Sequence, residues 1–524
     1  MAPSVAIIGA GFGGLCMAIR LERAGIGSYT VFEKAGDVGG TWRDNSYPGA
    51  GCDIPSHLYS YSFETYASWS RRYPDQPEIL AYLSHCADKY DVRRKIRFRS
   101  EVRSAVFDGS RWQVTATTPG HDSTDGDDGP HGDPQGNPHG NPHDNPHDNL
   151  RGNPHGDFHH AGERTEAFDV VVMSVGQLNR PHLPDIPGMS DFEGVSFHSA
   201  RWNHGHDLTG RQVAVIGTGS SAAQLIPPVA ERAGRLHVFQ RTPNWVIPKP
   251  DATFGPIEQL AFHHVPGLQR AYREWIYRYA EATLYPALAQ GWSASLLRRR
   301  ALAHLHAQVP DPALRAKLTP DYPPGCKRVV IDSRFYPALT RENVDVVTDK
   351  IVRIAPRGVE TTEGLREADT IIYATGFRST EFLAPMEVTG RGGRTLRERW
   401  ARGAEAYLGI SVPEFPNMFL LYGPNTNLGH NSIVFMIECQ VGHVMACLPR
   451  LAAEGPIEVR PEVMAAWSRR LGAAMERMVW NSGCQSWYKT AEGRVTNNWP
   501  GPTTLYRRLT SRPPRDAYRP APAG

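Results

Sequence analysis

The sequence lacks an excess of charge of either sign. Its 524 residues include 57 Lys and Arg against 54 Asp and Glu, so the formal net charge is only +3. Nucleic acids and anionic membranes bind proteins through surplus positive charge, and this balance gives no reason to expect either partner. A chain of this length, with 40% hydrophobic residues, should instead fold into two or three globular domains.

Long apolar runs are also missing. No stretch approaches the roughly 18 to 20 apolar residues that a helix needs to span a bilayer, so we expect no stable membrane insertion. The strand-like run Val5–Ile8 begins almost at Met1 and leads into a glycine-rich loop, which leaves no room for a signal peptide and predicts a cytoplasmic protein. The aromatic segment 275–292 is amphipathic enough to cover a core or to lie against lipid, and we favour the core.

Closely spaced cysteine pairs are absent. The sequence has no Cys-x-x-Cys, and its cysteines are scattered and odd in number: Cys16, Cys52, Cys86, Cys326, Cys439, Cys447 and Cys484. We therefore expect no disulfide framework, no metal site and no dithiol redox centre. Most of these thiols should be buried as small apolar side chains.

One segment has hardly any apolar residues. Between Pro119 and Arg164, units such as Gly-Asn-Pro-His repeat, and this composition cannot bury enough surface to offset the entropy of ordering. We expect a disordered loop at the tip of a hairpin whose strands cover residues 111–115 and 168–173. Its histidines could chelate a metal, although repeat expansion in a tolerant loop is the preferred explanation; they are His131, His139, His143, His147, His155, His159 and His160.

The chain contains an internal repeat. VAIIGAGFGG at residues 5–14 matches VAVIGTGSSA at 213–222, and DVVVMSVG at 169–176 matches DTIIYATG at 369–376. Each half begins with a strand, a glycine-rich loop and a helix, and ends with a buried strand followed by glycine. The predicted fold is α/β, with two Rossmann-like, doubly wound dinucleotide-binding domains, the second nested in the first. Residues 250–318 have helical spacing and few breakers, which predicts a helical insertion.

Both glycine-rich loops lie where a strand meets a helix, so a pyrophosphate can approach bare backbone N–H groups there. Two tight turns without a ligand are the alternative, which the paired context disfavours. The first loop supplies Gly9, Gly11, Phe12 and Gly14, and the second supplies Gly217, Thr218, Gly219, Ser220, Ser221 and Ala222.

The end of the second strand in each unit distinguishes the two ligands, because it lies beside the adenosine ribose. Glu33 ends the first of these strands, and a carboxylate accepts hydrogen bonds from a free 2′-hydroxyl. Arg241 follows Gly217 by the 24 residues that also separate Glu33 from Gly9, and a guanidinium suits a 2′-phosphate. We expect FAD in the first domain (residues 1–195 and 377–524) and NADPH in the second (196–376).

Three further segments resemble flavin-dependent class B monooxygenases. GGTW at 39–42, YPGAGCD at 47–53 and YSYSF at 59–63 are similar to the flavin-binding segment of that family. Within the family, Phe192, Gly194, His198 and Trp202 resemble the fingerprint FxGxxxHxxxW(P/D) of type I Baeyer-Villiger monooxygenases, with Asn203 where Pro or Asp is usual. Relatives that oxygenate nitrogen or sulfur usually differ at the position of Trp202, so the resemblance favours ketone oxidation.

The resemblance implies a role for each matching residue. Arg328 would be the catalytic arginine, with Asp53 orienting it, and His198 would affect the relative motion of the two folds unless it is a buried structural histidine. On the FAD side the implied residues are Gly40, Thr41, Trp42, Asp53, Tyr59 and Val102. On the NADPH side, Arg241, Thr242 and Lys327 would face the 2′-phosphate, and Arg328 and Trp487 would also contact the cofactor.

The implied activity is insertion of one oxygen atom from O2 next to a ketone carbonyl, with NADPH as reductant, to give an ester or lactone through a C4a-peroxyflavin. Such an enzyme must keep the peroxide anionic, and an arginine stabilises an anion without acting as a proton donor. Oxygenation of nitrogen or sulfur in small molecules is the alternative. The missing Cys-x-x-Cys argues against a pyridine-nucleotide disulfide reductase. Neither the natural substrate nor the oligomeric state can be inferred from the sequence.

Overall fold

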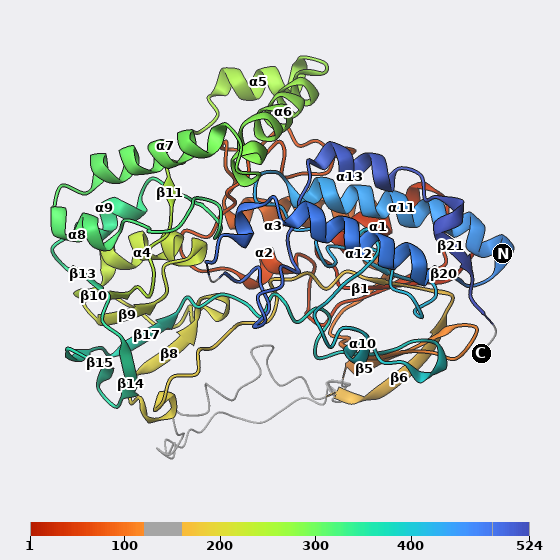
Figure 1. Ribbon diagram of the computed structural model, residues 1–524, viewed down its shortest axis with the longest axis horizontal. Helices are drawn as coiled ribbons and strands as arrows, with labels where there is room; N and C mark the ends of the chain where they lie inside the picture. The colour runs from red at the N-terminus through yellow and green to blue at the C-terminus, as the bar shows by residue number, and fades with distance from the viewer. Residues whose placement is uncertain (1, 120–159, 485, 523–524) are drawn as a thin grey trace, which may run out of the picture.

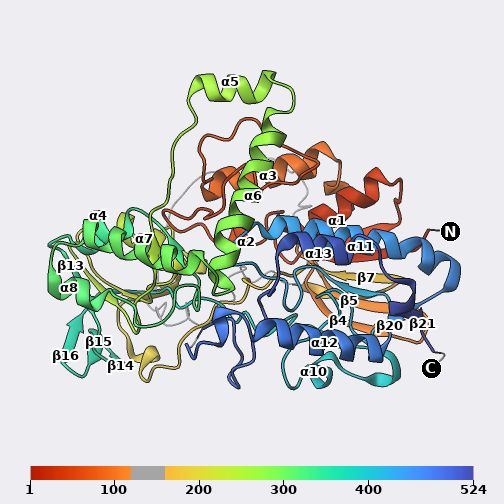
Figure 2. The same cartoon turned by 45° about the horizontal axis from the view of Figure 1, so that its top comes forward.

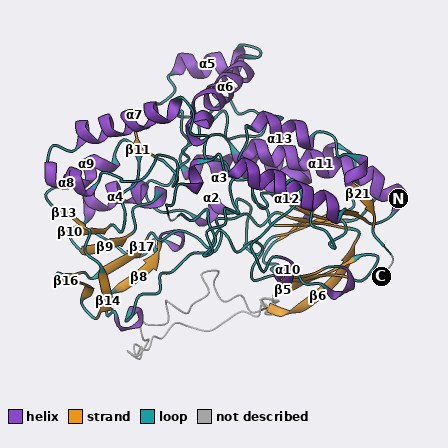
Figure 3. Ribbon diagram, viewed as in Figure 1, coloured by secondary structure: helices purple, strands orange, loops and turns teal. Residues whose placement is uncertain are grey.

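The computed structural model in Figure 1 describes residues 2–119, 160–484 and 486–522. Two parallel sheets lie toward opposite ends of its longest axis, and both chain ends lie beside the first sheet. Figure 3 shows strands gathered in these two regions, with helices above them and loops between them. The repeat in the sequence thus corresponds to two separate folding units.

The first sheet has the strand order β19-β7-β1-β2-β3, and all its pairings are parallel. Its central strands are apolar and buried along their length, as expected for a parallel sheet that is covered on both faces. In chain order the strands are β1 (Val5–Ile8), β2 (Tyr29–Phe32), β3 (Ile96–Arg97), β7 (Val170–Met173) and β19 (Met418–Leu420).

The second sheet repeats this arrangement in the order β8-β17-β9-β10-β13, again with parallel pairings. All its strands fall between β7 and β19 in the sequence, which confirms that the second fold is nested in the first. The exact domain boundaries stay a prediction. The strands are β8 (Val195–His198), β9 (Gln212–Ile216), β10 (Arg235–Phe239), β13 (Val344–Val347) and β17 (Thr370–Tyr373).

Each sheet lies between a helical layer and a small antiparallel sheet, which in the first unit also carries one parallel edge strand. Over the first sheet these are α1 (Phe12–Arg23), α3 (Gln76–Lys89), α11 (Ile433–Glu454) and α13 (Thr503–Thr510), with β18 (Glu387–Thr389), β4 (Val102–Phe107), β5 (Trp112–Pro119) and β6 (His160–Phe168) opposite. Over the second they are α4 (Ser220–Arg232) and α9 (Phe335–Leu339), with β14 (Ile351–Ala355), β15 (Gly358–Thr361) and β16 (Gly364–Glu367) opposite.

Alternation along the central strands produces these two cores. In β1, Val5 and Ile7 pack with the helices, whereas Ala6 and Ile8 pack with the antiparallel sheet. Successive side chains of a strand point to opposite faces, so a wholly apolar strand supplies both cores.

Outside these layers lie several smaller elements. They are α2 (Thr41–Asp44), α10 (Leu396–Arg399), α12 (Pro461–Met475), β11 (Val246–Ile247) paired with β12 (Val330–Ile331), β20 (Ile457–Val459) paired with β21 (Tyr518–Pro520), and short 3₁₀ helices such as η4 (Ser199–Arg201) and η6 (Val479–Asn481).

The predicted helical insertion is present. It contains α5 (Pro256–His264), α6 (Leu268–Leu288), α7 (Ser293–Gln308) and α8 (Pro312–Lys317), and α5 projects from the body of the molecule (Figure 2). The prediction that segment 275–292 covers a core is only partly correct. Ile276 and Tyr277 are buried against Leu58, but Trp275 is 60% exposed and Trp292 is 68% exposed.

The hairpin prediction was wrong in one strand. β5 pairs with β6 (His160–Phe168), which begins inside the predicted loop, whereas Val170–Met173 is β7 of the first parallel sheet. β6 was missed because its sequence is polar, with residues 162–165 exposed, as is common at a sheet edge. The rest of the predicted loop, with its histidines His131, His139, His143, His147, His155 and His159, lies outside the described residues. Within the described part of the chain, no three His, Cys, Asp or Glu residues are placed to hold a metal ion.

The expectation that no apolar run is long enough to span a membrane was also wrong. By length and composition, α11 qualifies, with 22 residues and a mean hydropathy of 1.2 in its most apolar window. Half of that window is buried, and Val434, Ile437 and Val444 belong to the core that α11 forms with α1 and α13. This packing is typical of a core helix, which passes the same test of length and composition.

Candidate functional site

A cavity of about 1670 Å³ lies between the two sheets, at the carboxyl ends of their strands. Its wall includes Gly9 after β1, Glu33 after β2, Gly217 after β9 and Gln240 after β10. Ligands of doubly wound folds bind at these strand ends. A typical small-molecule pocket measures about 300 to 1,000 Å³, so this cavity is large enough for two nucleotides.

The cavity brings together nearly all of the predicted cofactor-binding residues. Only Gly14 and Ala222 of that set are absent from its wall. The residues that line it are Gly9, Gly11, Phe12, Glu33, Gly40, Thr41, Trp42, Asp53, Tyr59, Val102, Gly217, Thr218, Gly219, Ser220, Ser221, Arg241, Thr242, Lys327, Arg328 and Trp487.

Two positions of the first glycine-rich loop, Gly9 and Gly14, leave no room for a side chain. A Cβ at Gly14 would lie 1.8 Å from the carbonyl oxygen of Gly9, and Gly9 itself has φ of +101°. Gly14 therefore serves the close packing of α1 on β1 rather than the cavity wall. Gly11 caps α1 without a side-chain hydrogen bond, so the first N–H groups of the helix are available to an anion.

The second loop repeats this geometry at α4. Gly217 has φ of +117°, and a Cβ there would lie 2.4 Å from the carbonyl oxygen of Ala374. Gly219 is the N-cap of α4 and also lacks a side-chain cap, while Ala222 is buried where the helix packs. Two uncapped helix N-termini thus face one cavity, which fits the pyrophosphates of two dinucleotides.

Glu33 is held rigidly at the end of β2. Its side chain is buried, and its two oxygens accept hydrogen bonds from the backbone N–H groups of Ala10, at 2.7 Å, and Ala35, at 2.9 Å. Arg43 Nη1 lies 3.4 Å from the same carboxylate. Each carboxylate oxygen accepts more than one hydrogen bond, so Glu33 can still accept a ribose hydroxyl.

Two cations lie together at the matching strand end of the second unit. Lys327 Nζ donates a hydrogen bond of 2.5 Å to Thr242 Oγ1, and the pKa of Lys327 is lowered, mainly by burial and further by the charge of Arg241. Neither Arg241 nor Lys327 forms an ion pair with any described acidic residue. Like charges held close without a counterion favour binding of an anion such as a phosphate.

Asp53 and Arg328 form an ion pair in the cavity wall. Asp53 Oδ2 accepts hydrogen bonds from Arg328 Nη2 at 2.5 Å and from Nε at 3.0 Å. The Asp53 charge raises the pKa of Arg328 further above its usual range, in spite of burial, which opposes the charge. Arg328 Nη1 also donates weakly to the carbonyl oxygen of Leu428, at 3.4 Å. The guanidinium is therefore permanently charged and fixed in direction.

Aromatic side chains from the flavin-like segment pack around the first loop. Trp42 Nε1 donates to the hydroxyl of Tyr59 at 3.1 Å, and the Tyr59 ring meets that of Phe12 edge to face, with 5.1 Å between centroids. Burial raises the pKa of Tyr59. Trp487 and Ser379 also line the cavity, and the Trp487 carbonyl oxygen accepts a hydrogen bond from Ser379 Oγ at 2.9 Å.

The fingerprint residues lie outside the cavity. His198 ends β8, where its Nδ1 accepts the Ala200 N–H at 3.1 Å, and burial lowers its pKa to about 4. Phe192 is buried, a Cβ at Gly194 would lie 2.3 Å from the carbonyl oxygen of Asp369, and Trp202 packs on the second core. These residues pack around β8, the edge strand of the second sheet, where the chain first passes from one fold to the other.

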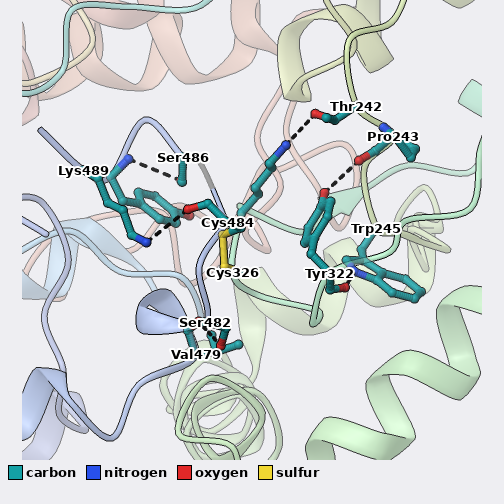
Figure 4. The surroundings of a disulfide bond; sticks show 12 residues. Thr242, Pro243, Trp245, Tyr322, Cys326, Val479, Ser482, Cys484, Ser486 and Lys489 are labelled. Carbon is teal, nitrogen blue, oxygen red and sulfur yellow. Dashed lines mark hydrogen bonds between the residues drawn. A yellow bond between two sulfur atoms is a disulfide. The ribbon is translucent and has the colours of Figure 1, made fainter. Parts of the chain in front are cut away.

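Sequence analysis missed a disulfide at this site. Cys326 and Cys484 are bonded, with a sequence separation of 158 and 6.2 Å between their Cα atoms (Figure 4). The expectation of free thiols is thus wrong for this pair, and it is correct for Cys16, Cys52, Cys86, Cys439 and Cys447, of which all but Cys439 are buried. No local signal marked the pair, because the free Cys16 and Cys52 also lie within three residues of predicted site residues.

Comparison with known proteins relates the chain to flavin-dependent monooxygenases. Residues 7–84 match the NAD(P)-binding Rossmann-like domain, and residues 157–265 match the flavin-binding monooxygenase-like family. The chain is 40% identical to a Baeyer-Villiger monooxygenase of Streptomyces coelicolor, over 99% of this chain and 93% of that protein.

Two solved structures have a similar fold over nearly the whole chain. An oxidized steroid monooxygenase bound to NADP is 32% identical and has a TM-score of 0.79, over 98% of this chain and 97% of that one. The OTEMO complex with FAD and NADP is 26% identical and has a TM-score of 0.80, over 99% of this chain and 100% of that one.

Proposed function

Because the chain belongs to the Baeyer-Villiger monooxygenase family, we propose that it oxidises a ketone beside the Asp53 and Arg328 pair, inserting one atom of O2 next to the carbonyl. The chain is a flavin- and NADPH-dependent monooxygenase, and the expected product is an ester or lactone. One observation carries the proposal: the paired, permanently charged Arg328 lies in the wall that both glycine-rich loops share.

The residues of the cavity divide into two nucleotide sites. FAD would place its pyrophosphate at the N-terminus of α1 and its adenosine ribose at Glu33, and NADPH would place the corresponding groups at α4 and at Arg241. Thr242 and Lys327 would complete the 2′-phosphate site, because they hold a second cation beside Arg241. When bound, FAD accepts hydride from NADPH and delivers one oxygen atom from O2 to the substrate.

Arg328 supplies a fixed positive charge where negative charge develops. Its guanidinium does not give up its proton, so it stabilises an anion without neutralising it. Ketone oxidation requires an anionic oxidant, because the carbonyl carbon is electrophilic. An interaction of this kind in a site shielded from water is worth several kcal/mol of barrier, on the order of 3 to 4 kcal/mol.

Asp53 acts by positioning that charge. Both of its hydrogen bonds to Arg328 use Oδ2 and hold the Nε and Nη2 edge of the guanidinium. Nη1 makes no contact with Asp53 and donates only weakly to the carbonyl oxygen of Leu428, at 3.4 Å, so this is the side that would address a bound anion. A buried arginine without a partner would be costly, and Asp53 removes that cost as well.

Product analysis tests the proposal. Purified protein loaded with FAD is incubated with NADPH, O2 and a panel of cyclic, linear and aryl ketones together with a sulfide, and products are identified by mass. We expect an ester or lactone from at least one ketone. Formation of a sulfoxide without any ester would overturn the ketone assignment in favour of heteroatom oxygenation.

Asn203, which departs from the fingerprint, gives no support to heteroatom oxygenation. Its side chain is exposed, and its Oδ1 accepts the N–H of Gly205 at 3.1 Å in a turn outside the cavity. Its departure from the fingerprint therefore changes a turn residue rather than a group facing the substrate.

A further inference from the structure

The Cys326–Cys484 disulfide joins two segments that both reach the cavity. Cys326 directly precedes Lys327 and Arg328, and Cys484 lies three residues before Trp487. The bond (Figure 4) therefore links the segment that carries the fixed charge to a second segment that lines the same cavity. Because the two segments belong to parts of the chain 158 residues apart, the bond closes a long covalent loop across the site.

The two sulfur atoms lie in different surroundings. Cys326 is fully buried in a cluster with Leu288, Trp480 and Tyr488, whereas Cys484 is only partly buried. Residues 481–483, which precede Cys484, are exposed. A small thiol can therefore reach the Cys484 side of the bond from solvent, with the Cys326 sulfur as the buried leaving group.

The Trp487 segment is a short loop between two buried aromatic side chains, Trp480 and Tyr488. Between Cys484 and Trp487, the described residues belong to no helix or strand. Ser379 Oγ donates to the Trp487 carbonyl oxygen at 2.9 Å, and Lys489 Nζ donates to the Cys484 carbonyl oxygen at 3.1 Å, the latter within the same segment. The disulfide is thus the only covalent cross-link of this irregular loop in the described chain, and its loss leaves the residues between the two buried rings held by non-covalent contacts alone.

We propose that this disulfide is a redox-dependent tether that keeps the Trp487 segment against the NADPH side of the cavity. The proposal rests on the assignment of that side to NADPH. Disulfides in reducing compartments are commonly transient and redox-sensing, and a bond with one accessible sulfur and a buried partner suits that use. In the enzyme with the disulfide formed, the Trp487 segment is already in place beside the NADPH site. In the enzyme with the disulfide reduced, this segment must become ordered each time NADPH binds.

Opening of the tether requires a dithiol reductant. One thiolate of the reductant attacks the Cys484 sulfur, the disulfide bond breaks and the Cys326 sulfur leaves as a thiolate, which takes up a proton. The second thiolate of the reductant then attacks its own mixed-disulfide sulfur and releases Cys484 as a thiolate, which also takes up a proton. The protein gains two thiols, and the reductant becomes a cyclic disulfide.

Thiol counting establishes the starting state. The chain has seven cysteines, so protein denatured without reductant should show five reactive thiols, matching the five free cysteines, and seven after reduction. Seven thiols before reduction in protein purified without reductant would overturn the proposal.

Binding of NADP⁺ to the FAD-loaded enzyme tests the tether itself. We expect dithiol treatment to weaken NADP⁺ binding by about 5-fold or more and to speed tryptic cleavage at Lys489 and Arg494. Cys484→Ser should show the same weakened binding and no further response to dithiol. Cys439→Ser is the matched control, because it removes a free thiol of α11 and should keep the dithiol response.

Equal NADP⁺ affinity and equal cleavage rates before and after reduction would overturn the tether. Because neither measurement uses a ketone, a protein that makes no ester but responds to dithiol in this way separates failure of the ketone assignment from failure of the tether. If Cys484→Ser does not fold, dithiol treatment of the unaltered enzyme decides the question alone.

Discussion

Arg328 depends on a partner that lies 275 positions away in the chain. Folding brings that carboxylate from the flavin-like segment to an arginine next to Lys327, so the charge in the cavity wall belongs to both halves. The pair can therefore be tested from either side.

Replacing Arg328 by Ala should separate flavin binding from product formation. We expect Arg328→Ala to retain FAD and to consume NADPH, while ester formation falls by about 100-fold or more because the anion loses its fixed counter-charge. Ester yield and NADPH consumption are measured together. Arg300→Ala, an exposed change on α7 outside the cavity, should leave both unchanged, and an unchanged ester yield in Arg328→Ala would refute the assignment.

Arg241 should determine the choice between NADPH and NADH. Removing it takes away a charge-assisted contact worth roughly 1.5 to 3 kcal/mol, so Arg241→Ala should raise the KM for NADPH by about 10-fold or more and leave that for NADH nearly unchanged. Steady-state oxidation of the two nucleotides measures the ratio. Arg232→Ala, at the exposed end of α4, serves as the control. Equal use of both nucleotides by the unaltered enzyme would contradict the assignment.

Helix α1 shows how one element joins sequence, packing and cofactor binding. Its first turn receives no side-chain cap, and it approaches β1 so closely that Gly14 has no space for a methyl group. The same backbone that packs the core therefore presents the N–H groups to the cavity.

A methyl group at Gly14 should abolish FAD loading. Gly14→Ala places a Cβ 1.8 Å from the Gly9 carbonyl oxygen, so α1 must move away from β1 and the N–H groups with it. FAD content and thermal midpoint should both fall. Gly442→Ala on α11, where a Cβ meets nothing within 4 Å, should instead stabilise the protein by about 0.5 to 1 kcal/mol through higher helix propensity. A normally loaded Gly14→Ala would contradict the packing argument.

Local signals predicted the elements unevenly. The glycine-rich loops and the strands β1 and β9 are encoded by neighbouring residues, so the nucleotide folds and the loop residues of the cavity wall could be predicted. Strand β6 could not, because a polar edge strand has no periodic apolar signal. The exposure of Trp275 and the bonding of Cys326 to Cys484 depend on which distant segments meet, and no local pattern encodes that.

The whole molecule carries buried histidines that should make its stability sensitive to acid. Burial lowers the pKa of His57, His198 and His443 to about 4, whereas an unfolded histidine titrates near 6.5. The unfolded chain therefore takes up protons first as the pH falls. The stabilisation is fully present above about pH 6.5 and is lost as the pH falls to about 4.

We expect the thermal midpoint to decrease steadily as the pH falls from about 6.5 to about 4, because each histidine contributes roughly 1 to 3 kcal/mol to the free energy of unfolding at the upper end of this range. Differential scanning calorimetry at several pH values measures the slope. His443→Gln, inside the first core, should flatten the profile, and His264→Gln, on the exposed face of α5, should not. A midpoint that stays constant between pH 6.5 and 4 would contradict the prediction.

The late position of strand β19 also matters for how the enzyme is made. All strands of the second sheet lie between residues 195 and 373, whereas the first sheet waits for Met418–Leu420. A ribosome releases the chain from its N-terminus, and domains fold as their residues emerge. The second sheet therefore has all its strands while the first still lacks an edge strand, so the nested unit can complete its sheet before the unit that encloses it.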